Sequence, residues 1–332
     1  MNLKPLGNTG LMVTPMGLGL ASLGRPGYIN LDHGKDLNHT YEEQTMEDHS
    51  HKMLELAWER GIRYFDAARS YGKAEQFLGN WIKKNPEFKH HGVIGSKWGY
   101  TYTADWKIEA EKHEVKEHSI QVLNRQWQET RENLGDALNL YQIHSATLES
   151  GVLSNQEVLN RLWELKEKGI KIGLSLSGTT QAETLEAAYK IKNGSLWLFD
   201  TVQITYNLLE ISTQDILTRV HDSGWGVIVK EGVANGRLTA KNKSPQWIEK
   251  FTYLRQQTEA YETTIDALAL GYLLSRHFVD IVLSGATTLA QLQSNLQALQ
   301  LDIPEKKWAE IVKQLVEHPV EYWQTRKSLN WN

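Results

Sequence analysis

The chain has 332 residues, of which 40% are hydrophobic and 23% are charged, a composition typical of a soluble globular protein with a substantial core. The formal net charge of −4 gives no electrostatic basis for binding nucleic acid or an anionic membrane. Because the chain has no cysteine, disulfides, thiolate catalysis and cysteine-based metal sites are excluded.

No targeting segment or membrane span is expected from the sequence. The N-terminal residues lack a basic segment followed by an apolar run, so no signal peptide is evident. No stretch approaches the ~18 consecutive apolar residues of a membrane helix. We therefore expect a cytoplasmic protein. Since no linker, repeat or low-complexity segment interrupts the chain, residues 1–332 are expected to form a single domain.

The first 44 residues combine a short hairpin, a strand and a long loop. Turn-forming residues 7–10 (Gly-Asn-Thr-Gly) separate two strand-like runs within residues 3–16, which predicts a β-hairpin. Another strand is expected around Gly17. Residues 24–44 are polar and contain Pro26, so they are expected to form a loop. A loop of this length in a compact domain is usually functional or disordered.

From residue 45 onward, helical and strand-like patterns alternate. Together with the strand at Gly17 there are eight expected strands, which favours a (β/α)8 TIM barrel with long βα loops. An open doubly wound sheet is the alternative, but no G-x-G-x-x-G motif follows a first strand. The expected strands span residues 64–66, 93–97, 138–144, 171–175, 201–206, 227–230 and 281–284. The expected helices span residues 45–60, 73–84, 116–134, 156–168, 182–192, 215–223, 265–274 and 289–299.

Three further segments are expected to be loops, and the chain should close with one more helix. The loops are residues 85–91, 99–114 and 240–245. Residues 305–316 predict an extra C-terminal helix, and an aromatic tail follows it.

Polar residues stand at the ends of three successive predicted strands. These residues are Asp66, Lys97 and His144, and Tyr71 lies in the loop after the first strand. The C-terminal ends of barrel strands are where catalytic side chains are found. A phenol of pKa ~10 is a poor proton donor unless a cation lowers its pKa, and a lysine oriented by an aspartate can supply that cation. Each residue alone would more often be a cap or an ion-pair partner, but together they predict a general acid site.

The same residues carry a resemblance to a known family. The segment Asp-Ala-Ala-Arg-Ser-Tyr-Gly at residues 66–72, then Lys97, then His144 closing a Leu-x-x-Ile-His strand, resembles the aldo-keto reductase superfamily. The resemblance extends from the N-terminal hairpin to residues 284–296. It implies that Asp66, Tyr71, Lys97 and His144 form that family's catalytic tetrad.

The resemblance also implies an extended nicotinamide dinucleotide across the barrel mouth. Ser175 and Gln203 match residues that contact the carboxamide, and Asn295 matches one that contacts adenine. The chain departs from the family at Leu176, where an asparagine is usual, and at Lys230, where many members place a ring. The full set of cofactor-binding residues implied in this way is Ala21, Ser22, Asp66, Ser175, Gln203, Lys230, Gly232, Gly236, Arg237, Ser284, Gly285, Ala286, Thr287, Thr288, Gln291 and Asn295.

The choice between the two nicotinamide coenzymes depends on the adenosine end. A 2′-phosphate is normally bound by Arg or Lys. Where NADP-preferring members carry basic side chains, this chain has Gly285 and Gln291. Thr287, Thr288 and Arg237 could compensate. On balance NADP(H) is favoured, with NAD(H) as the alternative.

The implied reaction is carbonyl reduction, or the reverse, with Tyr71 as the proton donor. Lys97, paired with Asp66, would lower the pKa of the phenol, and His144 would orient the carbonyl. Aromatic residues of the long loops are expected to form the substrate pocket. The candidates for the pocket wall are Tyr28, Trp98, Tyr100 and Trp106.

Other functions stay open at this stage. A cofactor-binding regulatory subunit with negligible turnover would keep the same fold, and a non-redox barrel lyase or hydrolase could use the same side chains. No metal is expected, because the histidines at positions 49, 51, 90 and 91 lack the spacing of a helical zinc site. The expected partner is a small carbonyl compound, with neither nucleic acid nor membrane, and the chain should be a monomer or a weak homo-oligomer.

Overall fold

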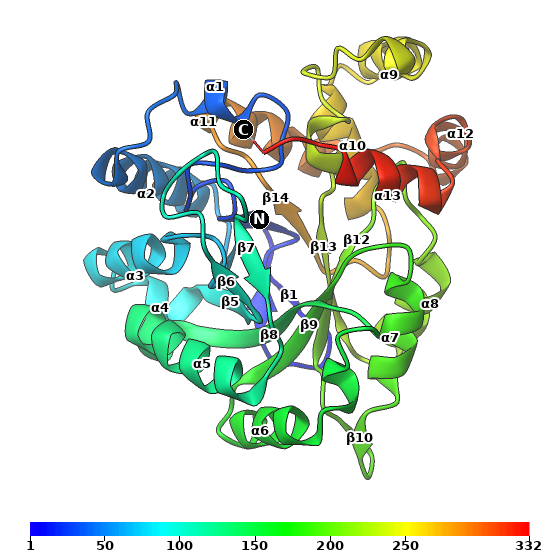
Figure 1. The fold of residues 1–332 in the computed structure, drawn as a ribbon. Coiled ribbons are helices and arrows are strands. Elements are labelled where there is room, and N and C mark those ends of the chain that lie inside the picture. Colours follow the sequence, from blue (N-terminus) through cyan, green and yellow to red (C-terminus); the bar gives the residue numbers. More distant parts are fainter. Residues whose placement is uncertain (332) are drawn as a thin grey trace.

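The computed structural model describes residues 1–331, and its centre is a closed barrel of eight parallel strands (Figure 1). Each strand pairs with the next one along the chain, and β14 pairs with β3 to close the barrel. This confirms the (β/α)8 fold expected from the sequence. The barrel strands are β3 (Met16–Gly19), β4 (Tyr64–Asp66), β5 (Val93–Trp98), β8 (Leu138–Ala146), β9 (Lys171–Leu176), β12 (Thr201–Thr205), β13 (Gly226–Lys230) and β14 (Ile281–Ser284).

Helices surround the barrel because each presents an apolar stripe to the strands. In α3, for example, Phe77, Leu78, Trp81 and Ile82 are buried, whereas the two lysines of its last turn are exposed. The surrounding helices are α2 (Glu43–Glu59), α3 (Ala74–Lys84), α5 (Ile120–Leu134), α6 (Gln156–Glu167), α7 (Gln181–Tyr189), α8 (Gln214–Asp222), α10 (Ile265–Leu274) and α11 (Leu289–Leu296), and the expected extra helix is α12 (Glu305–Leu315).

Two expected helices are shorter than their sequence patterns suggest, for local reasons. Residues 116–134 form a helix only from Ile120, because the Ser119 hydroxyl caps it by accepting a hydrogen bond from the Val122 N–H. The helix expected over residues 182–192 ends at Tyr189, because a small hairpin of β10 (Lys192–Asn193) and β11 (Leu196–Trp197) begins there.

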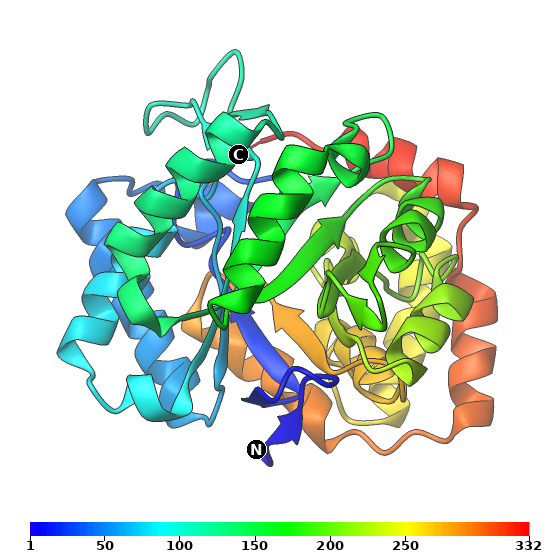
Figure 2. The same ribbon diagram turned by 90° about the horizontal axis from the view of Figure 1, so that it is seen from below.

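The N-terminal hairpin of β1 (Lys4–Pro5) and β2 (Met12–Val13) closes one end of the barrel. Leu6 and Val13 are fully buried and pack against the first residues of the barrel strands, including Val93 and Ile281. The approach is close: a Cβ on Gly7 would lie 2.4 Å from the Gly226 nitrogen, and Gly7 has φ +48°. Figure 2 shows the hairpin at the opposite end of the barrel from the C-terminal tail.

Several elements were not expected from the sequence. Expected loop residues 99–114 contribute β6 (Tyr100–Tyr102) to a hairpin with β7 (Glu114–Lys116), and the aromatic tail includes a helix, α13 (Pro319–Lys327). The remaining elements are α1 (His33–Asp36), α4 (Phe88–His91), α9 (Ile248–Ala260) and the 3-10 turns η1 (Gly135–Ala137), η2 (Val152–Ser154), η3 (Ala234–Gly236), η4 (Pro245–Trp247) and η5 (Gln297–Gln300). Over residues 1–331, no helix has both the length and the apolar character required to cross a bilayer.

Candidate active site

The C-terminal rim of the barrel brings together a buried carboxylate and a buried ammonium. Asp66 ends β4, and Lys97 lies near the end of the neighbouring strand β5. Lys97 is fully buried and Asp66 is 2% exposed, so both charges are removed from water. The Lys97 ammonium pairs with Asp66 Oδ2 and also donates to the Ala67 carbonyl at 2.9 Å. A buried charge is tolerated only when it is paired in this way.

A phenol and an imidazole complete the group. Tyr71 lies in the loop between β4 and α3, and the Lys97 Nζ is 4.9 Å from the centre of its ring. His144 lies on β8, and its ring meets the Tyr71 ring edge-on, with the centroids 5.5 Å apart and the planes at 85°. The four residues predicted from the sequence to form one site therefore lie together at one rim.

The other oxygen of Asp66 is held from across the barrel. Gln203, on β12, donates from Nε2 to Asp66 Oδ1 at 2.8 Å, and the Tyr64 hydroxyl donates to the same oxygen at 3.3 Å. Asp66 thus accepts hydrogen bonds from three side chains, which fixes the carboxylate and, through it, the Lys97 ammonium. The sequence resemblance assigns Gln203 to a cofactor contact. In the structure, one N–H of its side-chain amide is hydrogen-bonded to Asp66.

A close backbone contact sets the position of the Tyr71 loop. Gly72 has φ +59°, and a Cβ at this position would lie 2.4 Å from the Gly24 carbonyl oxygen. The Lys73 N–H donates to that same carbonyl at 2.7 Å. Glycine after Tyr71 is therefore required both by the backbone conformation and by the packing of this loop on the segment after β3.

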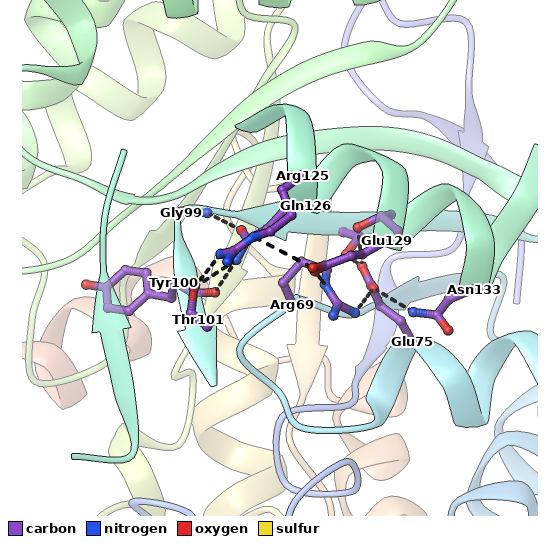
Figure 3. A network of polar contacts seen from close by, with 11 residues as sticks. Arg69, Glu75, Gly99, Tyr100, Thr101, Arg125, Gln126, Glu129 and Asn133 are labelled. Carbon is purple, nitrogen blue, oxygen red and sulfur yellow. Dashed lines mark hydrogen bonds and ion pairs between the residues drawn. The ribbon is translucent and has the colours of Figure 1, made fainter. Parts of the chain in front are cut away.

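A polar network behind the site anchors the same loop, and its role was not recognised from the sequence. The Arg69 guanidinium donates to Glu75 of α3 at 2.6 Å and to Glu129 of α5 at 2.9 Å. The backbone N–H of Arg69 donates to the Lys97 carbonyl at 3.0 Å. Figure 3 shows this network meeting a second cluster around Gln126, which reaches the β6 strand. The loop that carries Tyr71 is thus tied to two helices and to β5.

Arg25 is a second residue that sequence reasoning missed. Its guanidinium is 3% exposed and donates from Nη1 to the Ser70 carbonyl at 2.9 Å and to Glu114 at 3.0 Å. The same group lies over the rings of Tyr71, at 5.4 Å, and Trp331, at 4.7 Å. Arg25 therefore joins the long loop after β3, the Tyr71 loop, β7 and the C-terminal tail. Nothing in the local sequence pattern marks it.

Burial dominates the acidity of Tyr71. Desolvation raises the pKa of the phenol well above its usual value, the Asp66 carboxylate raises it further, and the Arg25 guanidinium opposes both. This differs from the lowered pKa expected from the sequence. In the protein without ligands Tyr71 therefore stays protonated at ordinary pH, which is the state that a proton donor needs.

His144 is held neutral by its surroundings. Burial lowers its pKa well below the ordinary value, and the nearby Lys97 and Lys230 lower it further. The Ser70 hydroxyl lies 3.3 Å from His144 Nδ1, and the His144 carbonyl lies 2.9 Å from His118 Nε2. The neutral ring can accept from Ser70 at Nδ1 only in the tautomer that carries the proton on Nε2.

We expect the protein to lose stability as the pH falls below about 6.5. Burial also lowers the pKa of His33 and of His118 to about 4, so with His144 three folded-state histidines resist protonation. Below the unfolded-state pKa of 6.5 the unfolded chain binds more protons, and each such histidine reduces the free energy of unfolding by up to about 1.4 kcal/mol per pH unit. Urea unfolding at several pH values between 7.5 and 4.5 measures this slope.

Two histidine variants make the measurement specific. His33→Gln should lower the pH dependence of the free energy of unfolding by up to the contribution of one proton, because burial holds the pKa of the fully buried His33 ring at about 4. His90→Gln, at an exposed position, is the matched control and should leave the slope unchanged. Equal stability at pH 7 and pH 5 in the unmodified protein would contradict the expectation.

A cavity of about 270 Å³ opens beside the four residues. Asp66, Tyr71 and His144 border it, and Arg25 and Trp331 form part of its outer wall. A second cavity of about 280 Å³ lies toward the start of α11. The two cavities share lining residues and therefore adjoin, and together we call them the slot. The shared residues are Asn30, Val233, Leu283, Ser284 and Gly285.

Most of the residues assigned from the sequence to a cofactor border this slot. Ala21, Ser22, Asp66, Gln203, Lys230 and Gly232 line the first cavity, Gly236, Ala286, Gln291 and Asn295 line the second, and Ser284 and Gly285 line both. Tyr28, assigned to the substrate pocket, also lines the first cavity. Ser175, Arg237, Thr287 and Thr288 lie outside the lining, as do Trp98, Tyr100 and Trp106.

The side chains outside the lining have other partners. The Ser175 hydroxyl accepts from the Ser145 N–H at 2.8 Å. Trp98 follows the inward-facing Lys97 on the same strand, so it points outward into the helix layer, where it packs on His118. Trp106 donates to the Tyr41 carbonyl at 2.6 Å. Tyr100 lies behind His144, with ring centroids 4.9 Å apart.

Lys230 places a positive charge in the wall of the first cavity. Its ammonium donates to the hydroxyls of Ser177 and Thr205, at 2.8 and 2.7 Å, and burial lowers its pKa to about 8. The adjacent Glu231 carboxylate accepts from Arg326 at 2.7 Å. Burial raises the pKa of Glu231, but the charges of Arg326 and Lys230 outweigh burial and lower this pKa to about 2. The slot therefore carries charges of both signs close to the four residues.

Within residues 1–331, no group of three His, Asp or Glu side chains is arranged to hold a metal ion. Two histidines that stood out in the sequence make backbone contacts instead. His49 Nε2 lies 2.6 Å from the Thr287 carbonyl, and His51 Nε2 lies 3.0 Å from the Phe77 carbonyl.

Comparisons with known proteins identify the family to which the chain is similar. A family model described as the Aldo/keto reductase family matches residues 15–315. Pyridoxal 4-dehydrogenase of Microbacterium luteolum is 24% identical over 349 residues, covering 92% of this chain and 95% of the relative. The NADH-specific methylglyoxal reductase of Escherichia coli (strain K12) is 24% identical over 327 residues, covering 91% of this chain and 94% of the relative.

A solved structure supports the fold. Aldo-keto reductase AKR11C1 from Bacillus halodurans, in its holo form, matches with a TM-score of 0.73 at 20% sequence identity, over 96% of this chain and 97% of that one. At this level of identity the likeness shows the fold alone.

Proposed function

Because the chain belongs to the aldo/keto reductase family, we propose that it is an NAD(P)(H)-dependent oxidoreductase that interconverts an aldehyde or ketone with an alcohol. The observation that carries the proposal is the meeting of Asp66, Tyr71, Lys97 and His144 beside two adjoining cavities of about 270 and 280 Å³. The named activities of the two relatives, a pyridoxal dehydrogenase and a methylglyoxal reductase, also concern carbonyl compounds.

The slot has the chemistry that a nicotinamide dinucleotide needs. Amide and hydroxyl groups of Gln203, Ser177 and Ser22 line the part near Tyr71, and the Lys230 ammonium can face a pyrophosphate. Gly232 and Gly285 allow a close approach of the backbone, and the far part ends at the start of α11. When bound, the coenzyme supplies or accepts the hydride.

The protein's own residues move and place the proton. Tyr71, protonated at rest, donates its phenolic proton to the carbonyl oxygen of the substrate. The Lys97 ammonium then stabilises the phenolate, and Asp66 keeps that ammonium charged and in place. His144 donates from Nε2 to the same carbonyl oxygen and so orients it. Proton transfer of this kind typically contributes about 10²–10⁴-fold to the rate.

Two measurements test the proposal. Titration with NADH and with NADPH, followed by the fluorescence of the twelve tryptophans, should show saturable binding of at least one coenzyme. Rapid mixing of that complex with a panel of aldehydes and ketones should then oxidise the bound coenzyme. Binding without oxidation across the panel would favour a regulatory subunit, whereas absence of binding would favour a non-redox barrel enzyme.

A further inference from the structure

We propose that the far cavity selects NAD(H) against NADP(H), with Asp266 and the ion pair between Asp36 and Lys241 as the determinants. The inference rests on the proposed function, since it concerns how this chain would hold the coenzyme of that reaction. It is the reverse of the preference favoured by the sequence.

The position of the catalytic residues decides which end of a dinucleotide the far cavity would hold. Tyr71 and His144 border the first cavity, so the reacting ring belongs there. The slot continues through Ser284 and Gly285 into the second cavity. The adenosine half therefore belongs in the second cavity, and the 2′-phosphate that distinguishes NADP(H) from NAD(H) would have to be accommodated there.

No unpaired cation faces this cavity in the part of the chain that the structure describes. Lys241 is the only Lys or Arg among its lining residues, and its ammonium is ion-paired with Asp36 of the long loop after β3. Arg237, the other candidate, is not among the lining residues: it is 8% exposed and its guanidinium donates to Glu317 at 2.6 Å. A 2′-phosphate is normally recognised by an Arg or Lys that is free to pair with it.

The start of α11 is also largely committed to internal hydrogen bonds. Gln291 Oε1 accepts from the N–H groups of Thr287, at 2.8 Å, and Thr288, at 3.4 Å. The Thr288 hydroxyl in turn accepts from the Gln291 N–H at 3.2 Å. This capping box uses the N–H groups of Thr288 and Gln291, and the Thr287 N–H bonds the same Gln291 side chain, so these groups are already occupied where an anion would otherwise bind.

A carboxylate lines the same cavity. Asp266 is half-buried, and its Oδ2 accepts from Asn295 Nδ2 at 2.7 Å. An acidic residue commonly recognises NAD(H) by accepting hydrogen bonds from ribose hydroxyls, and the Asp266 carboxylate borders the cavity in which the adenosine half would lie. The same charge would repel a 2′-phosphate, and a like-charge contact of this kind changes a binding constant by about tenfold.

The test is the ratio of two dissociation constants, measured by tryptophan fluorescence at one ionic strength. We expect NADH to bind at least about tenfold more tightly than NADPH. Asp266→Asn removes the repelling charge and Asp36→Asn frees Lys241, so each variant should bring the ratio closer to one. Asp36→Asn also loosens the long loop, but that loosening weakens both coenzymes alike and cancels in the ratio.

Introducing a positive charge into the far cavity gives a second, independent test of the coenzyme preference. Ala290 lines the cavity at an exposed position of α11, so Ala290→Arg should tighten NADPH binding more than NADH binding. Gln293→Arg adds the same charge to the same helix outside the cavity lining, and Asp302→Asn removes an exposed carboxylate elsewhere. Both are matched controls and should leave the ratio unchanged.

The outcomes separate this inference from the proposed function. Tight NADPH binding by the unmodified protein, at least equal to that of NADH, would overturn the inference and leave the proposed function intact. A ratio that Asp266→Asn, Asp36→Asn and Ala290→Arg all fail to change would overturn the assigned determinants. If neither coenzyme binds, both the proposed function and the inference fall.

Discussion

Replacing Tyr71 with phenylalanine is expected to lower kcat by about 10²–10⁴-fold and to leave coenzyme binding close to that of the unmodified protein. The substitution removes one hydroxyl and keeps the ring, so the contacts of the ring with Arg25, Lys97 and His144 persist. The fall in kcat would therefore measure the loss of proton donation and not a loss of packing. Steady-state turnover and coenzyme titration on the same preparation measure the two effects.

The pH dependence of turnover in the unmodified protein adds a second readout. His144 is held neutral and Tyr71 protonated across the ordinary range, so neither should produce a titration of turnover between about pH 6 and 8. Tyr253→Phe, on the outer helix α9, is the matched control and should turn over normally. Unchanged kcat in Tyr71→Phe would remove the proposed proton donor.

Lys97→Met is expected to impair both stability and turnover. The substitution leaves the Asp66 carboxylate buried without its countercharge, and breaking a buried ion pair in this way costs about 3–5 kcal/mol of the free energy of unfolding. It also removes the cation that stabilises the Tyr71 phenolate. Urea unfolding and steady-state kinetics measure the two losses separately.

A double variant distinguishes the structural role of the pair from its chemical role. Lys97→Met combined with Asp66→Asn carries neither charge, so much of the lost stability should return, because no unpaired buried charge remains. Turnover should stay low, since the phenolate still lacks a cation. Recovery of kcat together with stability would show that Lys97 acts only as a structural partner of Asp66.

The barrel strands could be predicted from the sequence because each is a short apolar run that is buried on both faces. The strands expected at residues 64–66 and 281–284 match β4 and β14 at both ends. Once the strands are in register, the positions of Asp66, Lys97 and His144 at the rim follow from the fold itself. The loop carrying Tyr71 was predictable for the same reason, since it directly follows β4.

The surroundings of these residues could not be predicted, because they depend on contacts between segments far apart in the chain. Arg25 meets Glu114 and Trp331, which are 89 and 306 residues away in sequence. No periodic pattern encodes such a contact. Likewise α9 was missed because it carries few apolar residues, with little in the sequence to indicate a buried face.

The hairpin of β1 and β2 has a consequence for how small molecules enter and leave the barrel. With that end filled by Leu6 and Val13, both reactants of the proposed reaction would enter and leave at the C-terminal rim. Whichever of them sits deeper has to arrive first and depart last. For the proposed reaction, the closed end of the barrel would thus impose an order of binding and release that does not depend on a difference in affinity.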